Sequence, residues 1–302
     1  MIHFLRNFKI IPLFIATTVA VLFGAITLYG VSESEGLPGD TRTQNVLVSI
    51  NPYKNIVNRI AGDTVKVVVL VPSGANMHTF EPTPKQVMQV SKADLWFRMG
   101  EQFEDKALPS LQSYNNKLKV VDLRDGVDLI CSPSQESCPH CREGCDLHFW
   151  LNPLIMKQQA KKITQNLIKL YPEHAEKYEE NLKKFTVEMD QLDDEIRTFL
   201  GPLKDRTIFV SHPAYAYFAK EYDLVQYTIE FEGRDPTPQQ LTRILESARD
   251  HKVKTIFIQR QYNNKGARLV AQEIGADLVV LDPYADDYIL EMRRIASKFT
   301  RK

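Results

Sequence analysis

The feature that most constrains the fold is a long amphipathic segment at residues 173–200. Its apolar side chains recur at alternating spacings of four and three residues, and charged residues fill the other positions, which is typical of an α-helix with one apolar stripe. The stripe consists of Tyr178, Leu182, Phe185, Met189, Leu192, Ile196 and Phe199. Pro172 suits the first helical turn, and Gly201-Pro202 suits a helix end. At about 1.5 Å per residue the helix is roughly 40 Å long. One compact lobe does not need that length, so we expect the helix to join two lobes; the alternative is a surface helix of a single domain.

The sequence on both sides of this helix alternates between strand and helix patterns. Before it, strands are predicted at 45–50, 64–71, 94–99 and 118–123, with helices at 52–61, from 84, at 103–114 and at 154–170. After it, strands are predicted at 207–210, 225–231, 255–258 and 277–281, with helices at 214–222, 237–251, 264–274 and 288–299. Apolar strands that alternate with helices indicate mostly parallel sheets covered on both faces. The predicted fold class is therefore α/β, with two Rossmann-like lobes joined by one long helix.

The predicted domain organisation follows from this alternation. An N-terminal α/β lobe is expected at 45–172, with a cysteine-containing loop at 124–147. The connecting helix is expected at 173–200, and a C-terminal α/β lobe at 201–302.

The first 32 residues are expected to direct export. Arg6 and Lys9 precede an uncharged apolar run from residue 10 to about residue 30, which is the layout of a signal peptide. The run is also long enough to span a bilayer, and no small-x-small cleavage site stands out before Ser32, so an uncleaved N-terminal anchor in contact with the membrane is the alternative. Residues 33–44 are expected to be a linker. We therefore expect the rest of the chain to work in the periplasm or on the outer face of the cytoplasmic membrane.

The charge balance excludes one class of partner. Lysine plus arginine and aspartate plus glutamate number 38 each, and no basic run interleaved with aromatic residues occurs. A chain without a basic surface lacks the attraction that nucleic-acid binding requires. We expect no nucleic-acid partner, and we expect a monomer.

Three histidines and one aspartate are the candidate metal ligands. His78 and His212 follow predicted strands, His148 follows the cysteine loop, and Asp282 follows the strand at 277–281. Ligands of open parallel sheets gather outside the carboxyl ends of the strands, so these four side chains can meet if the lobes face each other. Imidazole nitrogens and a carboxylate suit a divalent cation, with zinc the natural first choice.

The local sequences resemble those of a known family. The segments NMHTFEPTP at 76–84, DLHFWLNP at 146–153 and SHPAY at 211–215 resemble the three histidine motifs of TroA-like proteins. These are the extracytoplasmic solute-binding components of bacterial zinc and manganese ABC importers. The resemblance continues through FIQRQY at 257–262 and LDP at 281–283, and it covers the chain from Asn45 onward.

The resemblance implies a fold, a ligand set and a partner. It implies two α/β lobes tied by a rigid helix, a divalent metal ion between them as the transported ligand, and an ABC transporter permease that receives it. His78, His148 and His212 match the family's ligands, and Asp282 matches the place of the fourth, for which water is an alternative. Histidine at the third position favours zinc, with manganese or ferrous iron as alternatives. Two further residues, Glu81 and Gln259, are candidates for orienting an imidazole.

The loop at 124–147 departs from the family pattern. It holds all four cysteines of the chain, Cys131, Cys138, Cys141 and Cys145, together with His140. In an oxidising compartment four cysteines predict two disulfides, with three pairings open. A second, thiolate-rich metal site and a redox-active cysteine pair are the alternatives.

A zinc-dependent hydrolase or chelatase is the competing functional class. The chain contains neither His-Glu-x-x-His nor Gly-x-Ser-x-Gly, which are familiar catalytic motifs. We therefore expect a metal carrier without catalytic residues.

Overall fold

The computed structural model describes residues 44–131, 144–230 and 235–300. The chain divides into two units, Met1–Arg42 and Thr43–Lys302, and the described residues belong to the second. The predicted signal peptide or anchor, nearly all of the linker, and Cys138, His140 and Cys141 lie outside the described residues. Among the helices that are described, none has the length and apolar character needed to cross a membrane.

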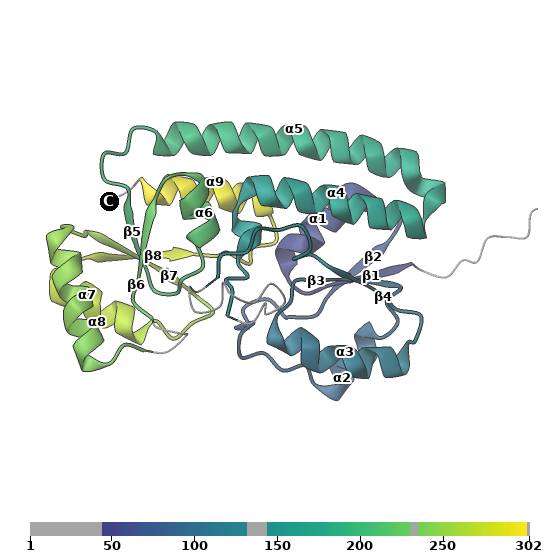
Figure 1. The fold of residues 1–302 in the computed structure, drawn as a ribbon, viewed down its shortest axis with the longest axis horizontal. Coiled ribbons are helices and arrows are strands. Elements are labelled where there is room, and N and C mark those ends of the chain that lie inside the picture. Colours follow the sequence, from purple (N-terminus) through teal and green to yellow (C-terminus); the bar gives the residue numbers. More distant parts are fainter. Residues whose placement is uncertain (1–43, 132–143, 231–234, 301–302) are drawn as a thin grey trace, which may run out of the picture. The chain divides into compact units, whose positions relative to one another are not determined.

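Two four-stranded parallel sheets form the framework of the second unit (Figure 1). The first contains β1 (Asn45–Val48), β2 (Lys66–Val69), β3 (Leu95–Arg98) and β4 (Lys119–Asp122), in the order β2-β1-β3-β4. The second contains β5 (Thr207–Val210), β6 (Val225–Thr228), β7 (Thr255–Gln259) and β8 (Asp277–Leu281), in the order β6-β5-β7-β8. Val46 lies between Val67 and Leu95 in the first register, and Phe209 lies between Tyr227 and Ile256 in the second. The repeated order and direction confirm the predicted α/β fold class.

Helices follow the strands, and several begin at residues that cap them. The helices are α1 (Asn51–Ala61), α2 (Pro84–Val90), α3 (Gln102–Tyr114), α4 (Pro153–Leu170), α5 (Ala175–Leu200), α6 (Ala216–Glu221), α7 (Pro238–Asp250), α8 (Lys265–Ile274) and α9 (Tyr288–Phe299). Thr83 and Thr237 each form a capping box with a glutamine three residues later, before a proline that opens the helix. Asn152 accepts hydrogen bonds from two backbone amides at the start of α4. Local capping therefore fixes where the elements around the candidate site begin.

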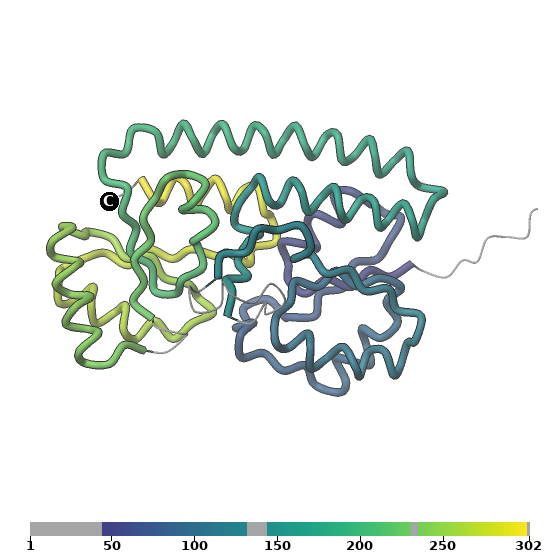
Figure 2. The backbone as a smooth tube through the Cα atoms, viewed as in Figure 1, coloured from purple at the N-terminus to yellow at the C-terminus, as the bar shows by residue number. Residues whose placement is uncertain are grey.

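The 26-residue helix α5 connects the two sheets and packs along both halves of the unit (Figure 2). It contacts α1 and α4 from the first half and α9 from the second. Its buried residues are Tyr178, Phe185, Met189, Leu192, Ile196 and Leu200. The predicted stripe was wrong at its end, because Phe199 is exposed and Leu200 is buried in its place. A step of four residues from Ile196 keeps the stripe facing α9, whereas a step of three rotates it away.

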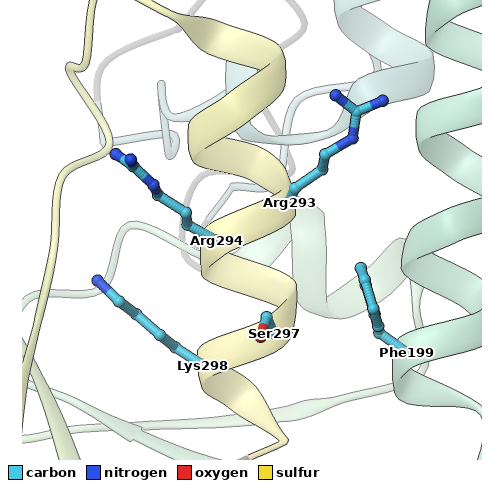
Figure 3. Close-up of a pocket in the computed structure, with 5 residues that line it drawn as sticks. All are labelled: Phe199, Arg293, Arg294, Ser297 and Lys298. Atoms are coloured by element: carbon cyan, nitrogen blue, oxygen red, sulfur yellow. The ribbon is translucent and has the colours of Figure 1, made fainter.

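Exposed Phe199 borders a pocket of about 260 Å³ between α5 and α9. Figure 3 shows Arg293, Arg294, Ser297 and Lys298 of α9 on the other side of this pocket. Arg293 pairs with Glu195, and Lys298 donates to the carbonyl oxygen of Val280 at 2.6 Å. Both cations have structural partners, and Lys298 has a favourable position in the last turn of α9.

The segment after His148 ties the first half of the unit to the second. Trp150 is fully buried, and its indole N–H donates to the carbonyl oxygen of Pro283 at 2.9 Å. The hydroxyl of Tyr288 in α9 donates to the carbonyl oxygen of Trp150 at 2.8 Å. A single apolar cluster covers the first sheet and continues through α4, α5 and α9, while a second, smaller one lies under α7 and α8. The histidines therefore sit on a packed framework.

Candidate metal centre

The fold brings the three predicted histidines to one place. His78 lies in the loop between β2 and α2, His148 directly precedes the short 3-10 helix Phe149–Leu151, and His212 follows β5. One ligand atom from each imidazole lies within 4.8 Å of the other two. His148 and His212 are buried, and His78 is the most exposed of the three with 33% of its side chain accessible, so the group opens to solvent on the His78 side. It is the one cluster of this kind found among the described residues.

Each imidazole is hydrogen-bonded to a carboxylate through its Nδ1 atom. Nδ1 of His78 donates to Glu101 at 3.3 Å. Nδ1 of His148 donates to Asp146 at 2.8 Å, and Nδ1 of His212 donates to Glu230 at 3.1 Å. A proton held on Nδ1 leaves the lone pair on Nε2, which is the form that binds a metal.

The Nε2 atoms are the ends of the three rings that do not contact these carboxylates. Nε2 of His78 lies 3.2 Å from Nε2 of His212. Nε2 of His148 is buried and has no hydrogen-bond partner in the described part of the chain. A buried nitrogen without a partner costs free energy unless it is satisfied by another group. The arrangement fits a cation that accepts three nitrogen lone pairs.

The electrostatics of the cluster prepare it for such a cation. Burial, together with the charges of His148 and His78, lowers the pKa of His212 to about 2, so His212 is neutral at physiological pH. Burial also opposes protonation of His78, but the hydrogen bond and charge of Glu101 outweigh it and raise the pKa of His78. Burial raises the pKa of Glu230 to about 7, and the nearby charge of Asp235 adds to this effect. Protonation is thus favoured at His78, beside a neutral His212.

The backbone around Glu101 is fixed by a second buried carboxylate. Glu104 in α3 accepts hydrogen bonds from the amides of Met99 and Glu101 at 3.0 Å, and from the amide of Gly100. Gly100 has a φ of +94°, and an added Cβ atom would lie 2.2 Å from the guanidinium of Arg124. Only glycine fits this turn without strain, so Glu101 reaches His78 from a fixed position.

Asp282 lies outside the histidine group. Its Oδ1 atom accepts a hydrogen bond from the side-chain amide of Gln261 at 2.8 Å and another from the backbone amide of Tyr284 at 3.2 Å. The ring of Tyr262 stacks on His212 with centroids 4.0 Å apart. The hydroxyls of Tyr262 and Tyr284 lie 3.3 Å apart.

The two residues predicted to orient imidazoles have other surroundings. Glu81 is exposed and pairs with Lys106 at 2.6 Å. Gln259 is buried, and neither of its side-chain polar atoms has a hydrogen-bond partner among the described residues. The orienting groups are instead Glu101, Asp146 and Glu230. Glu101 and Glu230 follow β3 and β6, so the strand-end rule that selected the histidines would have selected these carboxylates as well.

The cysteine loop is closed by a disulfide between Cys131 and Cys145. This bond confirms the predicted disulfide and selects its pairing. The second predicted disulfide stays a prediction, since Cys138 and Cys141 lie outside the described residues. Because Cys145 directly precedes Asp146, the disulfide ends beside the carboxylate that orients His148.

Comparison with known proteins places this fold in a class of bacterial metal-uptake proteins. The model of the family described as the periplasmic component A of the zinc-uptake complex matches residues 46–301. The chain belongs to this family, the ZnuA family.

Individual relatives span most of the chain. The high-affinity zinc uptake system protein ZnuA of Bacillus subtilis (strain 168) is 28% identical over 275 residues, which are 87% of this chain and 86% of the relative. The manganese ABC transporter substrate-binding lipoprotein PsaA of Streptococcus anginosus is 29% identical over 271 residues, covering 85% of each. A crystal structure of ZnuA superposes with a TM-score of 0.80 at 34% identity, covering 86% of this chain and 98% of that one.

Proposed function

We propose that this protein is an extracytoplasmic solute-binding protein that captures a divalent metal ion, most naturally zinc, and delivers it to the permease of an ABC importer. The observation that carries the proposal is the convergence of three imidazoles, each backed by its own carboxylate. Membership of the ZnuA family supports the same role.

The donor set favours zinc over manganese or ferrous iron. The proposed ligands are the Nε2 atoms of His78, His148 and His212, and nitrogen donors suit zinc better than they suit manganese, which prefers oxygen. Asp282 stays the proposed fourth ligand, with water as the alternative. To bind the metal, Asp282 has to exchange its hydrogen bonds with Gln261 and Tyr284 for the cation. Because one relative is a zinc uptake protein and another is a manganese-binding lipoprotein, both metals have to be tested.

A carrier role fits the surroundings of the site better than catalysis. A zinc hydrolase needs an open coordination position and a general base. Here the three nearby carboxylates, Glu101, Asp146 and Glu230, each accept a hydrogen bond from an imidazole. They are engaged in orienting ligands, and we propose no catalytic residue.

The location follows from the N-terminal sequence and the family. We propose that residues 1–32 act as a signal peptide or membrane anchor, and that residues 43–302 work as a monomer in the periplasm or on the outer face of the cytoplasmic membrane. The family's description as periplasmic supports this location.

The test is a competition titration of the full chain, purified metal-free in mild detergent, with zinc, manganese and ferrous iron. Zinc should bind at one equivalent and more tightly than the other two metals. A triple variant with His78→Ala, His148→Ala and His212→Ala should lose this binding, and the His251→Ala variant should keep it, because His251 lies at the end of α7, outside the histidine group. Undiminished binding by the triple variant would refute the proposal.

A further inference from the structure

The hydroxyl of Tyr217 joins the two ends of the cysteine loop. Tyr217 lies in α6, and its hydroxyl accepts a hydrogen bond from the amide of Ile130 at 2.9 Å and donates one to the carbonyl oxygen of Asp146 at 2.7 Å. The amide of Asp146 in turn donates to the carbonyl oxygen of Ile130 at 2.8 Å. Ile130 and Asp146 flank the disulfide between Cys131 and Cys145, so one side chain from α6 grips both ends where the loop closes.

The same aspartate orients a proposed metal ligand. Oδ1 of Asp146 accepts hydrogen bonds from both the backbone amide and Nδ1 of His148, each at 2.8 Å. The backbone of Asp146 is therefore held by Tyr217, while its side chain holds His148. At 2.7 Å, the bond at the carbonyl has the usual length of an O–H···O hydrogen bond.

Tyr217 is itself fixed in position. Its side chain is buried, and its ring meets Phe149 edge-on with centroids 6.4 Å apart. Burial raises the pKa of its hydroxyl, so the group stays protonated and can donate to Asp146.

The position of Tyr217 in the chain gives this contact its significance. Tyr217 stands five residues after His212, in the helix that follows the His212 loop. Its hydroxyl thus links the segment that carries His212 to the segment that carries His148. If the hydroxyl served only to fill its own hydrogen-bonding capacity, its partners would not have to lie beside His148.

We propose that Tyr217 is a positioning residue that sets the distance between His148 and His212 through Asp146. The inference rests on the proposed metal-binding function and adds to it a residue that does not touch the metal. Loss of a group that hydrogen-bonds a ligand directly typically lowers metal affinity 10- to 100-fold. Tyr217 acts one bond further out, so we expect the lower part of that range.

The variant Tyr217→Phe tests the proposal, with Tyr222→Phe as its matched control. Tyr222 directly follows α6, is buried, and loses one hydrogen bond to Asp193 when its hydroxyl is removed. Zinc affinity should fall about tenfold in Tyr217→Phe and stay within about twofold of wild type in Tyr222→Phe. The visible absorption of bound cobalt should change in Tyr217→Phe alone, because ligand geometry sets that spectrum. Equal zinc affinity and equal cobalt spectra in the two variants would overturn the proposal.

A measurement on the wild-type protein tests the same coupling without a variant. If the Tyr217 contact favours metal binding, metal binding must stabilise the contact by the same free energy. Zinc should therefore slow hydrogen exchange of the Ile130 amide, which donates to Tyr217. Unchanged exchange at Ile130 in a zinc-loaded sample would refute the coupling. Failure of wild type to bind zinc at all would instead refute the proposed function, so the two failures are distinguishable.

Discussion

Asp146 offers the sharpest test of how the carboxylates prepare the site. Its side chain accepts hydrogen bonds from the amide and Nδ1 of His148 at 2.8 Å, and the side chains of His148 and Asp146 are only 6% and 16% exposed. Solvent therefore screens their interaction weakly. When zinc binds Nε2, the ring gains positive charge, and the hydrogen bond from Nδ1 to the carboxylate becomes stronger. Removal of the carboxylate should thus weaken the metal-bound state more than the metal-free state.

Two substitutions separate charge from geometry at this position. In Asp146→Asn the remaining oxygen can still accept from His148, so only the charge is lost, and we expect about a tenfold rise in the zinc Kd. In Asp146→Ala the acceptor is lost as well, and the expected rise is about 100-fold, or about 3 kcal/mol at 1.4 kcal/mol per factor of ten.

The assay is a zinc competition titration against a chromophoric chelator at constant pH and ionic strength. Asp63→Asn is the control, since Asp63 is 91% exposed and pairs with Lys177 at the surface. Its zinc Kd should match that of wild type. An Asp146→Ala variant that folds normally and binds zinc within twofold of wild type would refute the idea that the carboxylate prepares His148.

Three further predictions concern stability and the surface. Burial raises the pKa of Glu104 from 4.5 to about 7, against the opposing effect of its hydrogen bonds, so the folded state binds more protons than the unfolded state between these values. The free energy of unfolding should therefore fall by about 3 kcal/mol as pH rises through this range. Urea titrations at several pH values should show a weaker pH dependence of this free energy in Glu104→Gln than in wild type. The same pH dependence in both proteins would contradict the raised pKa of Glu104. Phe185→Ala should destabilise the protein by about 3–5 kcal/mol, measured by urea unfolding, because it leaves a cavity under α5; a loss below 1 kcal/mol would mean that α5 is not packed as described. Glu81→Gln should change the free energy of unfolding by less than about 0.5 kcal/mol, since the ion pair of Glu81 with Lys106 is exposed. It should leave the zinc Kd unchanged. A tenfold change in the zinc Kd would show that Glu81 acts on the metal site.

Much of the fold could be predicted from sequence because local residue patterns indicate its strands and helices. The apolar strands predicted the two parallel sheets to within a few residues. The predicted helix starts at 84 and 237 agree with helices that Thr83 and Thr237 cap in the structure. The end of the α5 stripe was missed because Phe199 and Leu200 are both apolar, and only tertiary packing decides which one is buried.

The candidate site was less predictable than the fold. The histidines share a position after strands or loops and stand in recognisable motifs, so they could be selected. The pairing of Glu101 with His78 joins residues 23 apart, and that of Glu230 with His212 joins residues 18 apart. No local spacing specifies such contacts, because they depend on how two loops meet in space. The hydrogen bond of Asp282 to Gln261 is of the same kind.

Each sheet is built from one continuous stretch of the chain, and this has a consequence for the order in which the protein folds. All strands of the first sheet come from residues 45–122, and all strands of the second come from residues 207–281. As the chain emerges from a translocation pore, the first sheet can complete its pairing before the second has left, because domains fold as units from the N-terminus. His78 therefore reaches its place early. His212 arrives with the later sheet, and so do the groups that hold the His148 segment, Tyr217, Pro283 and Tyr288. The imidazole cluster is complete only when both halves have folded and docked. Under the proposed function, a metal ion that needs all three imidazoles binds the folded protein and shifts the folding equilibrium toward it.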